Sequence, residues 1–317
     1  MKSLITLHLT ALALLAMVLS GCKKDAIEKT YENKEYIAGY TRHDPEESDA
    51  FHLFNKNLLT YPLPEASGLV SGRKNPGLIY IHEDSGNRPV VFVYDTLGTF
   101  LGEIVLAGVN NRDWEDIAIG PGPETDVSYI YVGDIGDNKS VREELMIHRF
   151  PEPDITLVPD SLPFKIILTG FSTIKYRYPD GPRDAETLMI DPATKDLIII
   201  TKREVNVHVY RLLYPQAVDN YTPVFFKGKL PFRTIVGGDI SPDGKEILIK
   251  DYGRIYHWKV SDDIMGTLFW QTPSMVAYIP EVQGEAIGWT ADGTGYFTTT
   301  ETDKHQADPI LYHYRRR

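Results

Sequence analysis

The chain has 317 residues, of which 42% are hydrophobic and 24% are charged, a balance typical of a folded globular protein. Its net charge of −11 argues against nucleic acid as a partner, because phosphate recognition needs a basic face. The 25 Gly, 21 Pro and 19 Tyr residues favour β-structure that is rich in turns.

The first residues have the pattern of a secretory signal. A short positive start precedes residues 4–19, which are nearly all apolar but too few for a membrane span. Residues 19–22 read LSGC, which resembles the lipobox of bacterial lipoproteins, where the signal is removed and the cysteine is lipidated. We expect 1–21 to be a lipoprotein signal peptide and Cys22 to be the lipidation site. The alternative is an ordinary signal peptide with a chance cysteine.

A flexible tether is expected to follow. Cys22 is the single cysteine, so the mature protein has no other thiol for disulfides or metal binding. The next stretch, KKDAIEKTYENK, is charged and poor in apolar residues, and we assign 22–45 to the lipidated cysteine and the tether. The lipoprotein resemblance implies a stable lipid anchor in a membrane. Lys23 implies sorting to the outer membrane, on its periplasmic or cell-surface face.

The remaining residues, 46–317, contain a repeat and are expected to form one domain. In each copy, an acidic residue precedes small or apolar residues, a tight turn and two β-rich runs. The turns SPDGKE (241–246) and TADGTG (290–295) contain the residues that such turns favour. Self-similarity at a period of about 50 residues predicts a propeller.

Five copies of this unit can be aligned. The acids that begin them are Glu65, Glu115, Glu186, Asp239 and Glu285. The expected second strands are LIYIHE (78–83), SYIYVGD (128–134), LIIITKR (197–203), ILIKDY (247–252) and GYFTTTE (295–301). The expected third strands are VVFVYD (90–95), LMIHRF (145–150), VHVYRL (207–212), RIYHWKV (254–260) and ILYHY (310–314).

The predicted fold is an all-β, five-bladed propeller. The fifth unit has no room for a fourth strand, so the apolar stretch 51–61 is expected to supply it and to close the ring. A six-bladed propeller is the alternative, because residues 155–179 contain enough additional β-forming sequence for another blade.

Several motifs resemble those of known propellers. The SPDGK and ADGTG turns resemble the repeats of TolB-like and related bacterial propellers. The wider set DWEDIA, GDIGDN, GGDISPDG and GEAIGW resembles an uncharacterised family of secreted bacterial propellers, over about residues 60–317. The resemblance implies the fold and hardly any activity.

The repeat acids are candidate metal ligands. The first strand of each blade lines the channel of a propeller, so these acids are expected to form a ring at one mouth. Clustered carboxylates raise one another's pKa unless a cation or hydrogen-bond donors compensate. We therefore expect a Ca²⁺ site, with Asp113, Asp116 and Asp184 beside it as additional ligands. The alternative is that each acid caps the neighbouring blade. The five expected ligands are Glu65, Glu115, Glu186, Asp239 and Glu285.

The loops after the second strands are expected to open at the same mouth. They would bind a polar or anionic small molecule, or a protein partner, through acids, bases and a histidine. The expected binding residues are Glu83, Asp84, Asp134, Lys202, Arg203, Lys250 and Asp251. The candidates for a catalytic role are Glu115, Asp116 and His82.

The sequence favours a lipid-anchored, monomeric binding or scaffold module with a calcium site. The alternatives are a calcium-dependent hydrolase of phosphoesters or lactones, which phytase-like propellers imply, and a glycosidase. The chain has no GxSxG motif, P-loop or HExxH motif, so no specific enzyme class is indicated.

Overall fold

A computed structural model describes residues 34–157, 162–302 and 309–317. The chain divides into two units, and the second, Tyr36–Arg317, contains every element described below. The predicted signal peptide and Cys22 lie outside the described residues. Among the helices of the described part, none is both long and apolar enough to cross a membrane.

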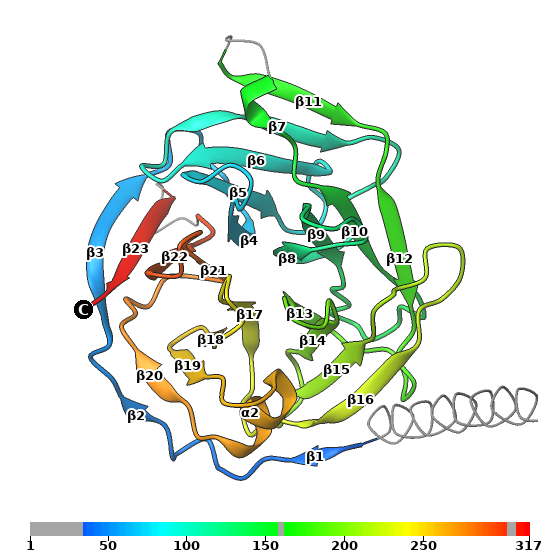
Figure 1. Cartoon of the computed structure of the whole chain (residues 1–317), viewed down its shortest axis with the longest axis vertical. Helices are drawn as coiled ribbons and strands as arrows, with labels where there is room; N and C mark the ends of the chain where they lie inside the picture. Colours follow the sequence, from blue (N-terminus) through cyan, green and yellow to red (C-terminus); the bar gives the residue numbers. More distant parts are fainter. Residues whose placement is uncertain (1–33, 158–161, 303–308) are drawn as a thin grey trace, which may run out of the picture. The chain divides into compact units, whose positions relative to one another are not determined.

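Five β-sheets stand around a central axis and form a propeller (Figure 1). The innermost strands are β4 (Ala66–Ser71), β8 (Trp114–Pro121), β13 (Ala185–Ile190), β17 (Ile235–Ile240) and β21 (Ala286–Trp289). The second strands are β5 (Leu78–Glu83), β9 (Ser128–Asp134), β14 (Leu197–Thr201), β18 (Glu246–Asp251) and β22 (Gly295–Thr299). The third strands are β6 (Val90–Asp95), β10 (Leu145–Pro151), β15 (His208–Leu212), β19 (Ile255–Lys259) and β23 (Ile310–Arg316).

An N-terminal strand closes the ring. The fourth strands of the first four blades are β7 (Phe100–Leu106), β12 (Ser172–Tyr176), β16 (Val224–Lys229) and β20 (Ser274–Val276). In the fifth blade this place is taken by β3 (Phe51–Leu58), which pairs antiparallel with β23. The predictions of five blades and of closure by an N-terminal strand are both confirmed. Closure removes two sheet edges that would otherwise be exposed.

The six-bladed alternative is wrong, because its β-forming sequence is divided between two existing blades. Residues Phe164–Leu168 form β11, which adds parallel to β7 at the outer edge of the first blade. The next strand, β12, is the fourth strand of the second blade. A 3₁₀ helix, η1 (Ile155–Leu157), precedes β11. This segment therefore links two neighbouring blades.

The start of the folded unit runs along the outside of three blades (Figure 1). Strand β1 (Tyr36–Ile37) pairs parallel with β16, and β2 (Glu46–Glu47) pairs parallel with β20, before the chain enters β3. The expected tether thus overlaps with β1. Helix α2 (Ile264–Trp270) is capped by Asp263, and its Phe269 stacks on Tyr36.

The hydrophobic core lies between the blades. Five clusters of buried side chains each combine residues from two neighbouring sheets, for example Val70 and Tyr80 of the first blade with Ile117 and Ile130 of the second. Because both faces of an inner sheet are covered, the innermost strands are buried almost throughout rather than alternating between buried and exposed residues. Hairpin turns join these strands, and Gly244 and Gly293 adopt positive φ there, which glycine tolerates.

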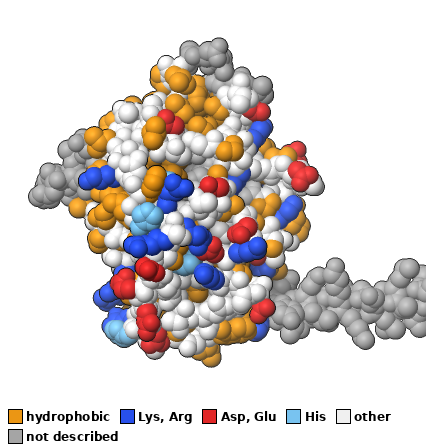
Figure 2. All heavy atoms as spheres, turned by 60° about the vertical axis from the view of Figure 1, so that its left-hand side comes forward, with side chains coloured by type: hydrophobic (Ala, Val, Ile, Leu, Met, Phe, Trp, Pro, Cys, Tyr) orange, Lys and Arg blue, Asp and Glu red, His pale blue; other side chains and the backbone are white. Residues whose placement is uncertain are grey.

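The outer surface carries charges of both signs. On the face shown in Figure 2, acidic and basic side chains lie among one another rather than in separate fields. Such a mixed surface is typical of a soluble domain.

Candidate functional site

Two of the predicted ring acids occupy a β-bulge at the start of an inner strand. The pairing of β8 with β9 skips Glu115, and the pairing of β13 with β14 skips Glu186. Ser67 and Val236 are the bulged residues of β4 and β17, and Glu285 directly precedes β21. A bulge changes the direction of a side chain relative to the regular strand. Glu115, Glu186 and Glu285 therefore occupy equivalent positions at the start of three innermost strands.

Four carboxylates from three blades converge around Glu115. In one group, Asp84, Asp113 and Glu115 have ligand oxygens within 4.8 Å of one another. In the other, the same holds for Glu115, Asp184 and Glu186. Asp84 follows β5, while Asp113 and Asp184 directly precede β8 and β13. We call these five residues the acid cluster.

The acid cluster contains buried carboxylate oxygens without partners. Glu115 is only 2% exposed, and among the described residues its carboxylate has neither a hydrogen bond nor an ion pair. The Oε2 atom of Glu186 is also buried with no partner in this part of the chain. Burial raises the pKa of both groups well above the usual range, and neighbouring carboxylates raise it further. The cluster therefore lacks sufficient positive charge.

Burial has the same effect on two further members of the acid cluster, Asp84 and Asp113. Burial raises the pKa of Asp84 to about 6, with added repulsion from Glu285 and Asp113. Burial also raises the pKa of Asp113. Burial and neighbouring carboxylates destabilise the charged form of these groups. Such carboxylates bind a cation readily, because the cation offsets that repulsion.

Lys202 is a cation beside the acid cluster, and it pairs with Glu186 and Glu285 rather than with Glu115. Its Nζ pairs with Glu186 and lies 3.3 Å from Oε1 of Glu285. The hydroxyl of Tyr252 donates to the same Glu285 oxygen at 2.6 Å. Burial by itself lowers the pKa of Lys202, but the two glutamates outweigh it and raise this pKa above its ordinary value. Lys202 thus compensates Glu186 and Glu285 and leaves Glu115 without a cation.

Asp184 is held in place by donors on both oxygens. Its Oδ1 accepts the backbone N–H of Asp137 at 2.7 Å, and its Oδ2 accepts Nε of Arg203 at 2.6 Å. Arg203 is half exposed, so its guanidinium lies at the rim of the mouth. These contacts preorganise the carboxylate towards Glu115.

A buried ion pair supports the loop that covers the cluster. Arg142 donates to Oδ1 of Asp134 and to the carbonyl of Gly136, both at 2.6 Å. A Cβ on Gly136 would collide with the carboxylate of Glu115. Asp134, predicted as a binding residue, therefore lies beneath the mouth and positions the GDIGDN loop.

Two buried acids tie neighbouring blades together instead of joining the cluster. Oδ2 of Asp116 accepts the N–H of Leu188 on β13, and Oδ2 of Asp239 accepts the N–H of Trp289 on β21, each at 2.8 Å. Asp239 stands three positions further along its strand than the bulge, so it faces a different level of the channel. The capping alternative considered for the ring acids describes these two residues.

Three other predicted residues lie away from the acid cluster. Glu65 is exposed and belongs to neither carboxylate group. Glu83 is partly buried, which raises its pKa. Asp251 accepts the hydroxyl of Tyr256 at 3.0 Å and lines a separate hollow on the fourth blade. The place of these three residues in the repeat therefore did not predict whether they join the acid cluster.

His82 and Lys250 are fully buried within the propeller. His82 packs edge-on against Trp114, and burial lowers its pKa to about 4, so the imidazole is neutral at pH 7. Lys250 donates to the carbonyl of Gly284 and lies 3.6 Å from Glu281. Both side chains have structural contacts and are out of reach of a ligand in solvent.

Two residues near the acid cluster, Tyr252 and Gly136, were not predicted from the sequence. Tyr252 directly follows the predicted binding residues Lys250 and Asp251, which was the available signal. Gly136 lies within the GDIGDN stretch, where a glycine permits close approach of the backbone to Glu115.

No protein-family model matches the chain, and no curated protein matches it. Among solved structures, the Neurospora crassa Pan2 WD40 domain aligns with 86% of this chain and 98% of its own length. The sequence identity is 10% and the TM-score is 0.44. The assignment as a β-propeller is made from the five sheets of this chain, and the resemblance to secreted lipoprotein propellers stays a prediction.

Proposed function

We propose that this protein is a β-propeller that binds a divalent cation, Ca²⁺, in the acid cluster and uses it to hold a polar or anionic ligand. The observation that carries the proposal is Glu115, a buried carboxylate without a partner that both carboxylate groups share. A cation at this point would relieve the repulsion that burial intensifies.

The donor set suits a hard cation. Carboxylate oxygens are the preferred ligands of Ca²⁺, which accepts six to eight oxygens in a flexible geometry. Glu115, Asp184 and Glu186 would hold the ion, with Asp84 and Asp113 completing the shell. Since the only cysteine lies outside this domain, thiolate-binding metals are disfavoured.

The rim of the mouth suits an anionic group. Arg203 donates through Nε to Asp184 and through Nη2 to Asn138, and its half-exposed guanidinium keeps further N–H groups for a ligand. A ligand carboxylate or phosphate would bridge the cation and this guanidinium, because a guanidinium binds such groups through two parallel hydrogen bonds.

Calcium titration of wild type and Glu115→Gln tests the proposal. We expect Ca²⁺ to raise the melting temperature of wild type, since a ligand at 100 times its Kd stabilises the folded state by about 2.7 kcal/mol. Glu115→Gln should lose this response and be at least as stable as wild type in chelator, because it removes a buried charge.

Glu65→Gln is the matched control, since Glu65 begins the same repeat in the first blade but lies outside the cluster. It should respond to Ca²⁺ as wild type does. An identical melting temperature of wild type with Ca²⁺ and with chelator would refute the proposal. Phosphoester, lactone and aryl-glycoside substrates should not be turned over; turnover lost in Glu115→Gln would make the protein a hydrolase.

We propose further that Cys22 carries a lipid anchor that holds the propeller in the outer membrane. The support is the LSGC sequence after an apolar run and the absence of other cysteines. Expressed in a bacterium, wild type should incorporate labelled palmitate and partition with membranes, and Cys22→Ser should do neither. Membrane association of Cys22→Ser equal to that of wild type would refute the anchor.

A further inference from the structure

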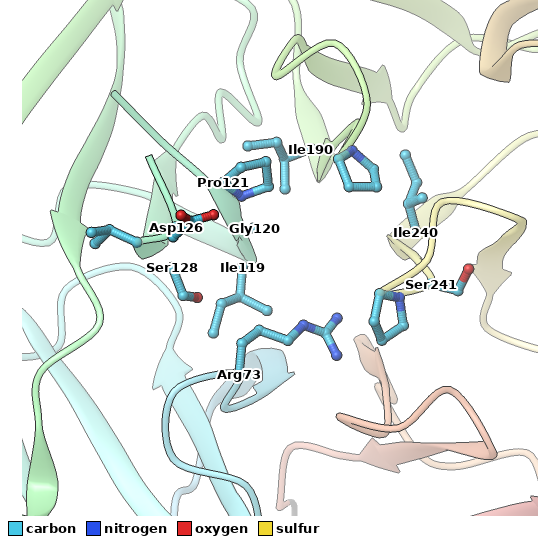
Figure 3. Close-up of a pocket in the computed structure, with 12 residues that line it drawn as sticks. Arg73, Ile119, Gly120, Pro121, Asp126, Ser128, Ile190, Ile240 and Ser241 are labelled. Atoms are coloured by element: carbon cyan, nitrogen blue, oxygen red, sulfur yellow. The ribbon is translucent and has the colours of Figure 1, made fainter. Parts of the chain in front are cut away.

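The opposite end of the channel holds a second cavity, of about 340 Å³ (Figure 3). It is formed where the innermost strands of four blades end and turn into their hairpins. We call it the proline mouth, because prolines of three blades surround it. Its lining includes Arg73, Pro121, Ser128, Pro192, Ile240 and Pro242.

Arg73 breaks the pseudo-symmetry of this ring. The last equivalent inner-strand residues are Ser71, Ile119, Ile190, Ile240 and Trp289, as their pairing registers show. Two residues further on, three blades have proline and the fifth has Ala291. At this position the first blade alone has a cation. Its guanidinium points towards the centre of the cavity in Figure 3.

The loop that carries Arg73 is fixed by a buried glutamate of the second blade. The backbone N–H groups of Arg73, Lys74 and Asn75 all donate to the carboxylate of Glu152, at 2.7–3.1 Å. The hydroxyl of Tyr80 donates to the same group at 3.1 Å. The carboxylate of Glu152 is therefore fully used in hydrogen bonds to this loop. These bonds fix the loop and hold Arg73 in a preorganised position.

Few nearby groups offset the positive charge of the Arg73 guanidinium. It donates through one nitrogen to the carbonyl of Thr290 at 3.3 Å, and no carboxylate of the described residues lies within 4 Å of it. Burial lowers the pKa of Arg73, while Asp239 and Glu152 raise it. A partly buried cation beside isoleucine and proline favours an anion with an apolar body.

A second polar group among the lining residues has no hydrogen-bond partner in the described part of the chain. The hydroxyl of Ser128 is buried and makes no hydrogen bond within the described residues. Asp126 stands at the rim and Asp239 lies near Arg73, so a second negative charge on the ligand would be repelled.

We propose that the proline mouth is a second binding site, specific for a small organic monocarboxylate, whose carboxylate is held by Arg73 and whose apolar body contacts the isoleucines and prolines. This site lies at the other end of the channel from the acid cluster and does not depend on the calcium proposal.

Isothermal titration of the full domain in chelator tests this site. The probes are benzoate, benzyl alcohol and inorganic phosphate. We expect saturable binding of benzoate and at least tenfold weaker binding of the other two, since the alcohol lacks the charge and phosphate carries too much. Equal affinity for benzoate and benzyl alcohol, or tighter binding of phosphate, would overturn the proposal.

Variants locate the site. Arg73→Gln should weaken benzoate binding at least tenfold, and Arg88→Gln, an exposed arginine of the same blade paired with Glu103, should leave it unchanged. Pro242→Trp narrows the cavity while Arg73 is retained, and it should also weaken benzoate binding. This second variant keeps the test valid if Arg73→Gln does not fold. Wild-type affinity in Pro242→Trp, or in folded Arg73→Gln, would refute the site.

A peptide probe then separates two sources of the carboxylate. An acetylated tripeptide ending in phenylalanine carries the same group at its C-terminus, and its C-terminal amide does not. Binding of the acid but not of the amide would extend the site to peptide C-termini. If neither peptide binds while benzoate does, the site is restricted to free organic acids. Tighter binding of the amide than of the acid would contradict carboxylate recognition.

Discussion

Two acids that are adjacent in the sequence have different roles because of where their oxygens point. Glu115 occupies the bulge of β8 and meets other carboxylates, whereas Asp116 accepts the N–H of Leu188 on the next blade. Successive side chains of a strand leave opposite faces, and the bulge adds to that change of direction. Burial raises the pKa of both, but backbone donors partly offset it only for Asp116.

Asp239 gives a residue-level prediction about pH. Burial raises its pKa from 3.8 to about 6, although Arg73 and the N–H of Trp289 act against this. The folded state therefore binds the proton more tightly than the unfolded chain, and the stabilisation present at low pH is lost as pH rises through 6. Asp239→Asn should reduce the gain in free energy of unfolding between pH 8 and pH 5 by about 1 kcal/mol, measured by urea unfolding.

Asp243→Asn is the control for that measurement. Asp243 lies on the same hairpin, but a hydrogen bond from Ser241 lowers its pKa, so its contribution has the opposite sign. This variant should not reduce the gain at pH 5. Equal pH dependence of Asp239→Asn and wild type would show that the aspartate is not strained in the folded protein.

At the scale of elements, strand β3 joins distant parts of the chain. It pairs with β23, and its first residue, Phe51, packs against His257 of the fourth blade and against Trp289 and Tyr296 of the fifth. The apolar stretch 51–61 indicated a strand, and its place was predictable because the fifth unit lacked one. The two-residue strands β1 and β2 were not predictable, since so short a segment has no recognisable periodicity.

Phe51 and Phe54 provide a matched pair of substitutions on β3. Phe51 is 2% exposed and Phe54 is 53% exposed. Phe51→Ala should lower the free energy of unfolding by about 3–5 kcal/mol, because it leaves a cavity between two blades. Phe54→Ala should change it by less than about 1 kcal/mol. Chemical denaturation measures both, and equal losses would contradict the packing described for β3.

At the scale of the molecule, stability depends on closing the ring. Each of the five hydrophobic clusters needs two neighbouring blades, so no blade buries both of its faces alone. The blade completed by the two ends of the chain is the closure point. Loss of β3 from this blade would expose an edge of β23 and the hydrophobic cluster around Phe51.

A shortened chain tests closure. A chain that begins at residue 60 lacks β1, β2 and β3, and we expect it to unfold at a much lower temperature and to aggregate through the open edge of β23. A chain that begins at residue 34 retains these strands and should melt as the full domain does. A synthetic peptide of residues 46–60 should restore part of the lost stability. Unchanged melting of the shorter chain would refute closure by β3.

The sequence by itself determined the repeat, the second and third strands of each blade and the fold class, because these follow from self-similarity along the chain, from runs of β-forming residues and from turn chemistry. The level of each acid in the channel was decided only by the tertiary structure. Glu65 and Asp239 match the repeat pattern as well as Glu115 does, yet the bulges place Ser67 and Val236 at their blades' equivalent positions. A shift of one or a few residues along a strand changes which side chain enters the channel, and no local pattern records that shift.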